Sequence, residues 1–156
     1  MAPHGGGRTV VDVPATAPTA LVRSTATSVL VAEPHAGLRE ALVGLLHHEQ
    51  HVAVTSCRSW AELVHEVVER APAVVLMHRR LMGVGDHHAI ATLRALAPRT
   101  TVLVAGMQAD AQFAPEALRA GASGYVPLDS PPEEIIAAIG TAAGRAPAVR
   151  LAVCAG

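Results

Sequence analysis

Lysine is absent from this chain of 156 residues, and its twelve basic residues are all arginine. This absence excludes Schiff-base catalysis and the phosphate-binding loops that depend on a lysine ammonium group. Aromatic residues are also scarce, at 2% of the chain, so a core has to be built from valine, leucine, isoleucine and alanine. Hydrophobic residues nevertheless make up 51% and charged residues only 16%, which predicts one globular domain.

Cysteine occurs only as Cys57 and Cys154, which have neither the spacing of a metal site nor the density of a disulfide framework. The formal net charge of -1 provides no general attraction to nucleic acid or to anionic lipid. No apolar run approaches the roughly 20 residues of a membrane span, and prolines near the N-terminus interrupt any signal-peptide core. We therefore expect a reduced, cytoplasmic protein that makes no direct contact with nucleic acid or membrane.

The chain divides into three segments of different composition. Residues 1–27 are rich in glycine, proline, alanine and threonine without a sustained period, which predicts a disordered N-terminal tail. Residues 28–143 carry the regular hydrophobic patterns of a folded domain. Residues 144–156 are predicted to be a C-terminal stub.

The residues 73–77, AVVLM, are apolar without any alternation. A strand that is apolar on both faces suits the middle of a parallel sheet covered by helices on both sides. Four further predicted strands, of which 28–32 and 101–105 are also predicted to be buried, alternate with five segments of helical period. This order predicts an α/β sandwich of three layers with right-handed crossovers. The predicted strands are residues 28–32, 51–55, 73–77, 101–105 and 124–126. Two predicted helices cover about residues 36–48 and 110–120, and three others start at Ser59, Asp86 and Ser130.

Capping residues mark the ends of these predicted helices. Ser59 and Glu62 have the spacing of a capping box. Residues 130–133, SPPE, combine an N-cap serine, a proline at the first helical position and a glutamate at the third. Asp86 can cap the third helix, and Gly121 is a suitable left-handed C-cap. The apolar residues predicted to point inward include Leu63, Val64, Val67, Val68, Ile90, Leu93 and Leu96.

Four stretches of the sequence have the residue patterns of one known protein family. They are VLVAEPHAGLREAL (residues 29–42), APAVVLMHRRLMGVGD (71–86), EALRAGASGYV (116–126) and SPPEEIIAAI (130–139). Together they resemble the receiver domains of two-component response regulators, and EALRAGASGYV is the most specific of them. The resemblance covers about residues 28–143 and implies a flavodoxin-like fold, with a five-stranded parallel sheet in the order 2-1-3-4-5 and five helices.

The family transfers a phosphoryl group onto an aspartate at the end of the third strand, with the help of Mg²⁺. The resemblance places this phosphoacceptor position on His78. The two acidic residues that hold Mg²⁺ correspond to Glu33 and Pro34. One carboxylate is therefore retained, and the other is replaced by a side chain without a ligand atom.

Three further positions of the family contact the phosphoryl group or report its presence. The hydroxyl position falls on Gly106, or on Ala105 if the alignment shifts by one residue. The lysine position falls on Leu128, and the aromatic residue that reports the switch is retained as Tyr125. Without the hydroxyl and the cation, the charge of a transferred phosphoryl group is not stabilised.

These substitutions predict an atypical receiver that is not an enzyme, forms no aspartyl phosphate and has lost or weakened its Mg²⁺ binding, with no other cofactor. We expect it to act as a signalling module through a protein partner, a second copy of itself, or both. In the family, the fourth helix, fifth strand and fifth helix form the interaction face. In this chain that face would include Phe113, Arg119, Tyr125 and Glu134.

Two alternative functions remain open. A pocket lined by Glu33, His78, Arg79 and Gly106 would bind a small metabolite in place of the phosphoryl group, with His78 and Arg79 as anion contacts. Alternatively, the chain is a conventional phosphorelay receiver.

The nine histidines also suggest a metal site. However, neighbouring histidines on a helix point about 100° apart and no cysteine or aspartate completes a set, so solvated helix ends are the preferred interpretation. The clustered histidines are His47, His48, His51, His87 and His88.

Overall fold

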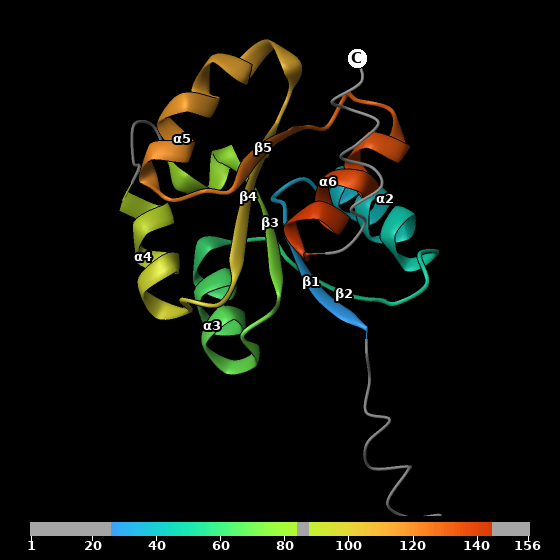
Figure 1. Cartoon of the computed structure of the whole chain (residues 1–156), viewed down its shortest axis with the longest axis horizontal. Coiled ribbons are helices and arrows are strands. Elements are labelled where there is room, and N and C mark those ends of the chain that lie inside the picture. Colours follow the sequence, from blue (N-terminus) through green and yellow to red (C-terminus); the bar gives the residue numbers. More distant parts are fainter. Residues whose placement is uncertain (1–25, 84–87, 145–156) are drawn as a thin grey trace, which may run out of the picture.

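The computed structural model describes residues 26–83 and 88–144, which form a parallel sheet with helices on both faces (Figure 1). Its five strands have the order β2-β1-β3-β4-β5, so the predicted flavodoxin-like fold is confirmed. The strands are β1 (Thr27–Ala32), β2 (Val52–Cys57), β3 (Val74–His78), β4 (Thr101–Gly106) and β5 (Gly124–Pro127). The α-helices are α2 (Ala36–His47), α3 (Trp60–Arg70), α4 (His88–Leu96), α5 (Ala114–Ala120) and α6 (Pro132–Ala142). The short 3-10 helices are η1 (Arg79–Met82) and η2 (Gln108–Phe113).

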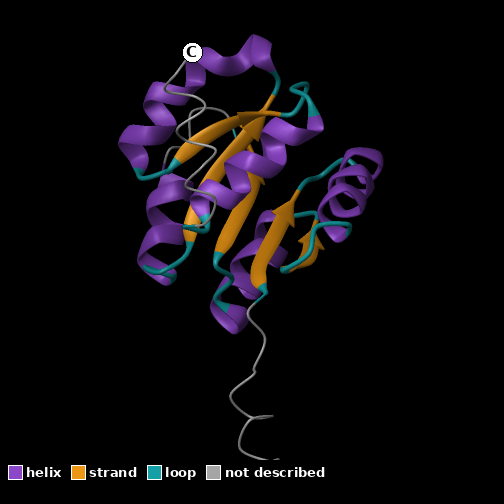
Figure 2. Cartoon of the chain, turned by 45° about the vertical axis from the view of Figure 1, so that its right-hand side comes forward, coloured by secondary structure: helices purple, strands orange, loops and turns teal. Residues whose placement is uncertain are grey.

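The sheet separates two hydrophobic clusters, and successive residues of β3 alternate between them. Val74 and Leu76 belong to the cluster shared with α2 and α6, whereas Val75 and Met77 belong to the cluster shared with α3, α4 and α5. Figure 2 shows the strands side by side between these two helical layers. Because all of β3 is buried, the absence of polar alternation in its sequence is explained by its place in the middle of the sheet.

The strand predictions agree with the observed bounds within two residues. Strand β1 begins one residue earlier than predicted, at Thr27. Most of the predicted tail (1–27) and stub (144–156) lies outside the described residues. None of the helices in the described ranges combines the length and the hydropathy that crossing a membrane requires.

Two of the predicted helix ends are confirmed. The hydroxyl of Ser59 accepts a hydrogen bond of 3.2 Å from the backbone N–H of Glu62. The Glu62 carboxylate in turn accepts from the backbone N–H of Arg58, one residue before the N-cap, at 2.9 Å. Gly121 is the C-cap of α5 with φ of 117°, a conformation that glycine adopts without the steric cost of a Cβ.

The prediction for the start of the last helix is wrong. The N-cap of α6 is Pro131 and not Ser130, and no side chain caps this end. The backbone N–H of Ser130 bonds to the carbonyl of Pro127 at 3.2 Å, so Ser130 belongs to the turn after β5. The helix consequently begins with Pro132, one residue later than predicted. The other predicted cap, Asp86, lies outside the described residues.

The single helix predicted over about residues 110–120 is also wrong in detail, because η2 occupies the first part and α5 begins only at Ala114. Pro115 explains the boundary, since a proline is tolerated in the first turn of an α-helix but not in its interior.

Two apolar residues that were predicted to point inward are exposed. Leu96 is 44% exposed because Leu93 and Ala97 take the inward positions at the end of α4. Val68 is 54% exposed, since it lies about 100° around the helix from the buried Val67.

Candidate functional site

The carboxyl ends of β1, β3 and β4 bring three of the predicted site residues to one edge of the sheet. Glu33 follows β1 directly, His78 is the last residue of β3, and Gly106 is the last residue of β4. The parallel register pairs Ala32 with Met77 and His78 with Ala105, so these strand ends are level with one another. Ligand sites of open α/β sheets form at this edge, and we therefore treat it as the candidate site.

Glu33 is a buried carboxylate, with a relative exposure of 1%. Its Oε1 accepts a hydrogen bond of 2.9 Å from the backbone N–H of His35 and lies 3.2 Å from Nδ1 of the same residue. Arg39 donates to the backbone carbonyl of Glu33 at 2.9 Å. The other carboxylate oxygen, Oε2, has no hydrogen-bond partner in the described part of the chain. Leaving a buried acceptor without a partner costs free energy, so this oxygen requires an explanation.

His78 is buried beside Glu33, with a relative exposure of 6%. Its Nδ1 accepts a hydrogen bond of 3.1 Å from the backbone N–H of Arg80. An accepting Nδ1 carries no proton, so the neutral ring holds its proton on Nε2. Nε2 lies 3.8 Å from Oε2 of Glu33, which is too long for a hydrogen bond.

The environment of His78 favours the neutral imidazole. Burial is the main cause that lowers its pKa from the ordinary value of 6.5. The Glu33 carboxylate opposes this effect, and the nearby Arg80 supports it. The geometry agrees, because protonation of Nδ1 would break the bond from the Arg80 backbone.

Gly106 lies against the side chains of Tyr125 and Arg79. A Cβ built at Gly106 would come 3.2 Å from Cζ of Tyr125 and 3.0 Å from Cδ of Arg79, and it would overlap the Tyr125 hydroxyl. That hydroxyl donates to the backbone carbonyl of Met107 at 3.0 Å. Burial raises the pKa of Tyr125 from its ordinary value of 10.0; Asp110 adds to the rise and Arg79 opposes it.

The Arg79 side chain extends from the end of β3 toward η2. Its guanidinium carbon lies 5.2 Å from the centroid of the Phe113 ring, and Nη1 lies 3.9 Å from Oδ2 of Asp110. Its Nε is buried without a hydrogen-bond partner in the described chain. The predicted anion contacts are therefore already engaged in part, since Nδ1 of His78 accepts a backbone bond and Arg79 faces an aromatic ring and a carboxylate.

Leu128 packs against the cluster shared with α2 and α6, and its backbone N–H donates to the carbonyl of Gly106 at 2.7 Å. Pro34 is half-buried directly after Glu33 and contributes no side-chain polar atom. The residues of the predicted interaction face lie on four elements. Phe113 and Tyr125 are partly buried against the cluster shared with α3, α4 and α5, whereas Arg119 on α5 and Glu134 on α6 are exposed.

Sequence reasoning did not single out His35, Met107 and Asp110, which hold the site residues in place. His35 had a usable signal, because a histidine two residues after a carboxylate can reach back to it. Asp110 and Met107 gave no such signal, since their contacts with Arg79 and Tyr125 exist only after β3, β4 and β5 have paired.

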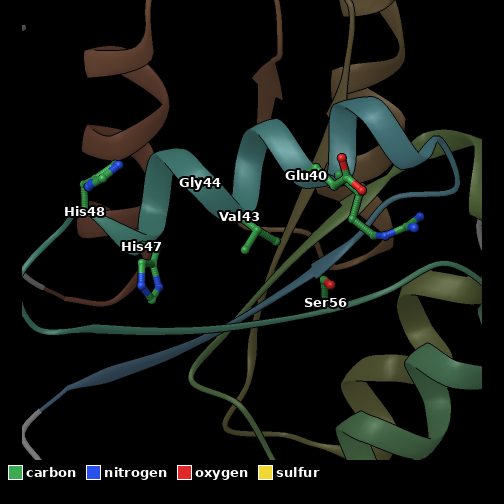
Figure 3. Close-up of a pocket in the computed structure, with 7 residues that line it drawn as sticks. Glu40, Val43, Gly44, His47, His48 and Ser56 are labelled. Atoms are coloured by element: carbon green, nitrogen blue, oxygen red, sulfur yellow. The ribbon is translucent and has the colours of Figure 1, made fainter.

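A separate hollow of about 360 Å³ lies between α2 and the edge strand β2 (Figure 3). Its lining includes Arg39, Glu40, Val43, His47 and Ser56. The His47 and His48 rings contact each other edge to face, with centroids 6.5 Å apart. No group of three or more His, Cys, Asp or Glu side chains in residues 26–83 and 88–144 is arranged to hold a metal ion. His87 lies outside these ranges.

The known proteins that match this chain include response regulators and their receiver domains. The family model for the response regulator receiver domain matches residues 29–140. The oxygen regulatory protein NreC of Staphylococcus epidermidis is 28% identical over 116 residues, which are 72% of this chain and 53% of NreC. The chain thus spans about half the length of the curated relatives it matches.

Solved structures with the same fold include two with appreciable sequence similarity. A two-component response regulator of the LuxR family from Aurantimonas sp. SI85-9A1 is 30% identical, with a TM-score of 0.69, and the match covers 77% of this chain and 87% of that one. The signal receiver domain of NarL from Mycobacterium tuberculosis is 26% identical, with a TM-score of 0.69, over 76% of this chain and 97% of that one.

Proposed function

Because the chain belongs to the response regulator receiver domain family, we propose that it is a receiver that signals through protein contacts without aspartyl phosphorylation. The observation that carries this proposal is the buried imidazole of His78 at the end of β3, where the family resemblance expects the phosphoacceptor aspartate. The domain would then be a non-enzymatic signalling module. Its output depends on which protein it contacts and not on a bound phosphoryl group.

The state of His78 supports this proposal. A nucleophilic nitrogen would need a free lone pair directed at the phosphodonor. The lone pair of Nδ1 accepts the Arg80 backbone N–H, and Nε2 carries the proton and faces Glu33. The imidazole is therefore a poor replacement for the carboxylate nucleophile.

The residues around Glu33 do not fit a Mg²⁺ ion, which prefers several oxygen ligands in an octahedral arrangement. Oε1 of Glu33 already accepts from His35, and Oε2 faces the N–H of His78. Pro34 occupies the second acidic position and has no ligand atom. One carboxylate with an imidazole N–H beside it is a weak site for a hard divalent cation.

The remaining two positions offer no stabilisation to a phosphoryl group. Gly106 has no hydroxyl, and the space beside it is filled by Tyr125 and Arg79. Leu128 has no charge and packs against the core. The developing charge of a transferred phosphoryl group would meet neither a hydroxyl from residue 106 nor a cation from residue 128.

The test of this proposal is incubation of the full chain with acetyl phosphate and Mg²⁺, followed by intact-mass measurement. We expect no gain in mass, while a receiver that retains the aspartate gains about 80 Da in parallel. The variant His78→Asp is also expected to remain unmodified, because Pro34 and Leu128 still lack the required groups. A stoichiometric adduct on the wild-type chain would identify a conventional phosphorelay receiver and overturn the proposal.

For partner binding we propose the face formed by α5, β5 and α6. The exposed Arg119 and Glu134 place charges of opposite sign on it, and Phe113 and Tyr125 add partly buried aromatic surface. Light scattering of the full chain measures self-association, and capture from native lysate measures other partners. Arg119→Glu should weaken the association, and Arg58→Glu, exposed directly after β2 at the opposite edge of the sheet, should not. If the chain is a monomer and the amount of captured partner is the same for Arg119→Glu as for the wild type, this face is not the binding surface.

One observation favours the alternative of a metabolite-sensing receiver. Oε2 of Glu33 and Nε of Arg79 are both buried without hydrogen-bond partners in the described chain, so a small molecule with a donor and an acceptor would satisfy them. Against it, Tyr125 and Arg79 fill the space beside Gly106. A thermal-shift screen with anionic metabolites separates the two functions, because a saturable rise in the melting temperature favours sensing.

A further inference from the structure

The local backbone conformation does not require a glycine at position 106. Its φ lies outside the left-handed range, whereas Gly83 and Gly121 have φ of 75° and 117°. Residue 106 also ends a regular strand, where glycine is unfavourable because it has no side chain to pack. The remaining reason for a glycine is the close approach of another group.

That group is the phenol of Tyr125. A Cβ at residue 106 would overlap the hydroxyl and lie 3.2 Å from Cζ, so no other residue type at this position is compatible with the observed ring placement. The hydroxyl reaches past Gly106 and donates to the Met107 carbonyl at 3.0 Å. The ring thus connects β5 to the loop after β4.

Arg79 closes the same space from the side of β3. Its Cδ lies 3.0 Å from the Cβ position at Gly106, and its guanidinium is placed by Phe113 at 5.2 Å and by Asp110 at 3.9 Å. An outward turn of Tyr125 would take the phenol out of this space. It would also break the hydrogen bond from the phenol to the Met107 carbonyl. Each contact therefore favours the same ring position.

We propose that Gly106, Met107 and Arg79 form a slot, here called the Tyr125 slot, that fixes the tyrosine ring in one position. The part of the proposed partner-binding face that β5 and α5 form then keeps a single conformation. The resemblance assigns Tyr125 the role of reporting a change at the phosphoacceptor position. In the Tyr125 slot the ring cannot report such a change, so the domain presents one permanent binding surface. This consequence for binding rests on the proposed function, whereas the slot itself does not.

The test uses the full chain with ¹³C-labelled tyrosine, because Tyr125 is the only tyrosine and gives a single set of ring signals. We expect nuclear Overhauser contacts from the ring to the α-protons of Gly106 and the δ-protons of Arg79. We also expect the pKa of the phenol to lie above its ordinary value of 10.0. Absent contacts, or two ring populations in slow exchange, would overturn the proposal.

The variant Gly106→Ala places a methyl group in the slot and should displace the ring. The contacts to Arg79 should disappear, and the pKa of the phenol should fall toward its ordinary value. Gly44→Ala on α2 is the matched control, since a Cβ there meets nothing within 4 Å and should leave the tyrosine signals unchanged. Unchanged ring signals in a folded Gly106→Ala variant would contradict the slot.

Fluorescence of Trp60, the only tryptophan, reports whether Gly106→Ala is folded. If it is not, Arg79→Ala opens the slot from the other side, and the ring contacts to the Gly106 α-protons should weaken. Acetyl phosphate with Mg²⁺ separates the two proposals. A phosphoryl adduct with unmoved ring signals would overturn the proposed function alone, and absent slot contacts in an unmodified protein would overturn the slot alone.

Discussion

Oε2 of Glu33 lies 3.8 Å from Nε2 of His78, and both side chains are almost fully buried. The carboxylate is close enough to influence the charge of the imidazole, but the two groups are too far apart for a hydrogen bond. Burial and the Arg80 backbone contact keep the imidazole neutral. The edge of the sheet that carries phosphoryl chemistry in the family therefore holds, in this chain, a neutral ring beside a carboxylate.

The first prediction concerns stability against pH. The pKa of His78 is lowered in the folded state, so the unfolded chain binds more protons below the ordinary value of 6.5. Folding stability contributed by His78 should be fully present above pH 6.5 and should be lost as the pH falls through the lowered pKa. Thermal melts at a series of pH values measure this loss. His78→Asn, whose Oδ1 can replace Nδ1 as acceptor, should show a shallower decline; an equal decline would assign the effect to other groups.

The second prediction isolates the influence of Glu33. Its carboxylate raises the pKa of His78 against the larger effect of burial. Glu33→Gln removes that charge and keeps an oxygen acceptor for the His35 N–H, so the pKa of His78 should fall further. Titration of the His78 Hε1 signal by NMR measures the change. A rise in this pKa would show that Glu33 does not act on His78 through its charge.

The third prediction compares two serines that have the same sequence signal. Ser59 accepts the Glu62 N–H at the start of α3, so Ser59→Ala should destabilise the protein by about 1 kcal/mol. Ser130 makes no such bond at the start of α6, and Ser130→Ala should change stability by less than about 0.5 kcal/mol. Urea denaturation measures both. Equal losses would mean that Ser130 caps α6 in solution.

The fourth prediction tests the core assignment. Leu76 is 1% exposed in the middle strand, so Leu76→Ala should destabilise the fold by about 2 to 5 kcal/mol. Val68 on α3 is 54% exposed, and Val68→Ala should have little effect. Both variants are compared by denaturant midpoint. A large loss at Val68 would indicate that this residue is covered in solution, for example by a second molecule.

Much of the fold was predictable because it depends on patterns that are local in the sequence. The unbroken apolar residues 73–77 favoured a strand buried on both faces, and the cap at Ser59 depends on a residue only three positions away. Val68 and Leu96 were misplaced because their exposure depends on which neighbouring residue takes the inward position.

The candidate site was predictable in part. The resemblance brought Glu33, His78 and Gly106 to one edge, and the strand register places them there. The packing of Tyr125 and Arg79 against Gly106 could not be read from the sequence. It depends on the side-chain directions of residues on β4, β5 and η1, which come together only in the folded sheet.

Every strand pair in this sheet is parallel, and this has a kinetic consequence. A tight turn cannot join two parallel neighbours, so each pairing has to wait until an intervening helical segment has crossed over the sheet. The contacts that define β3 are consequently distant along the chain. The domain should therefore fold more slowly than a helical bundle of the same length. Until β1 and β4 have paired with it, the apolar middle strand β3 remains able to pair with other segments.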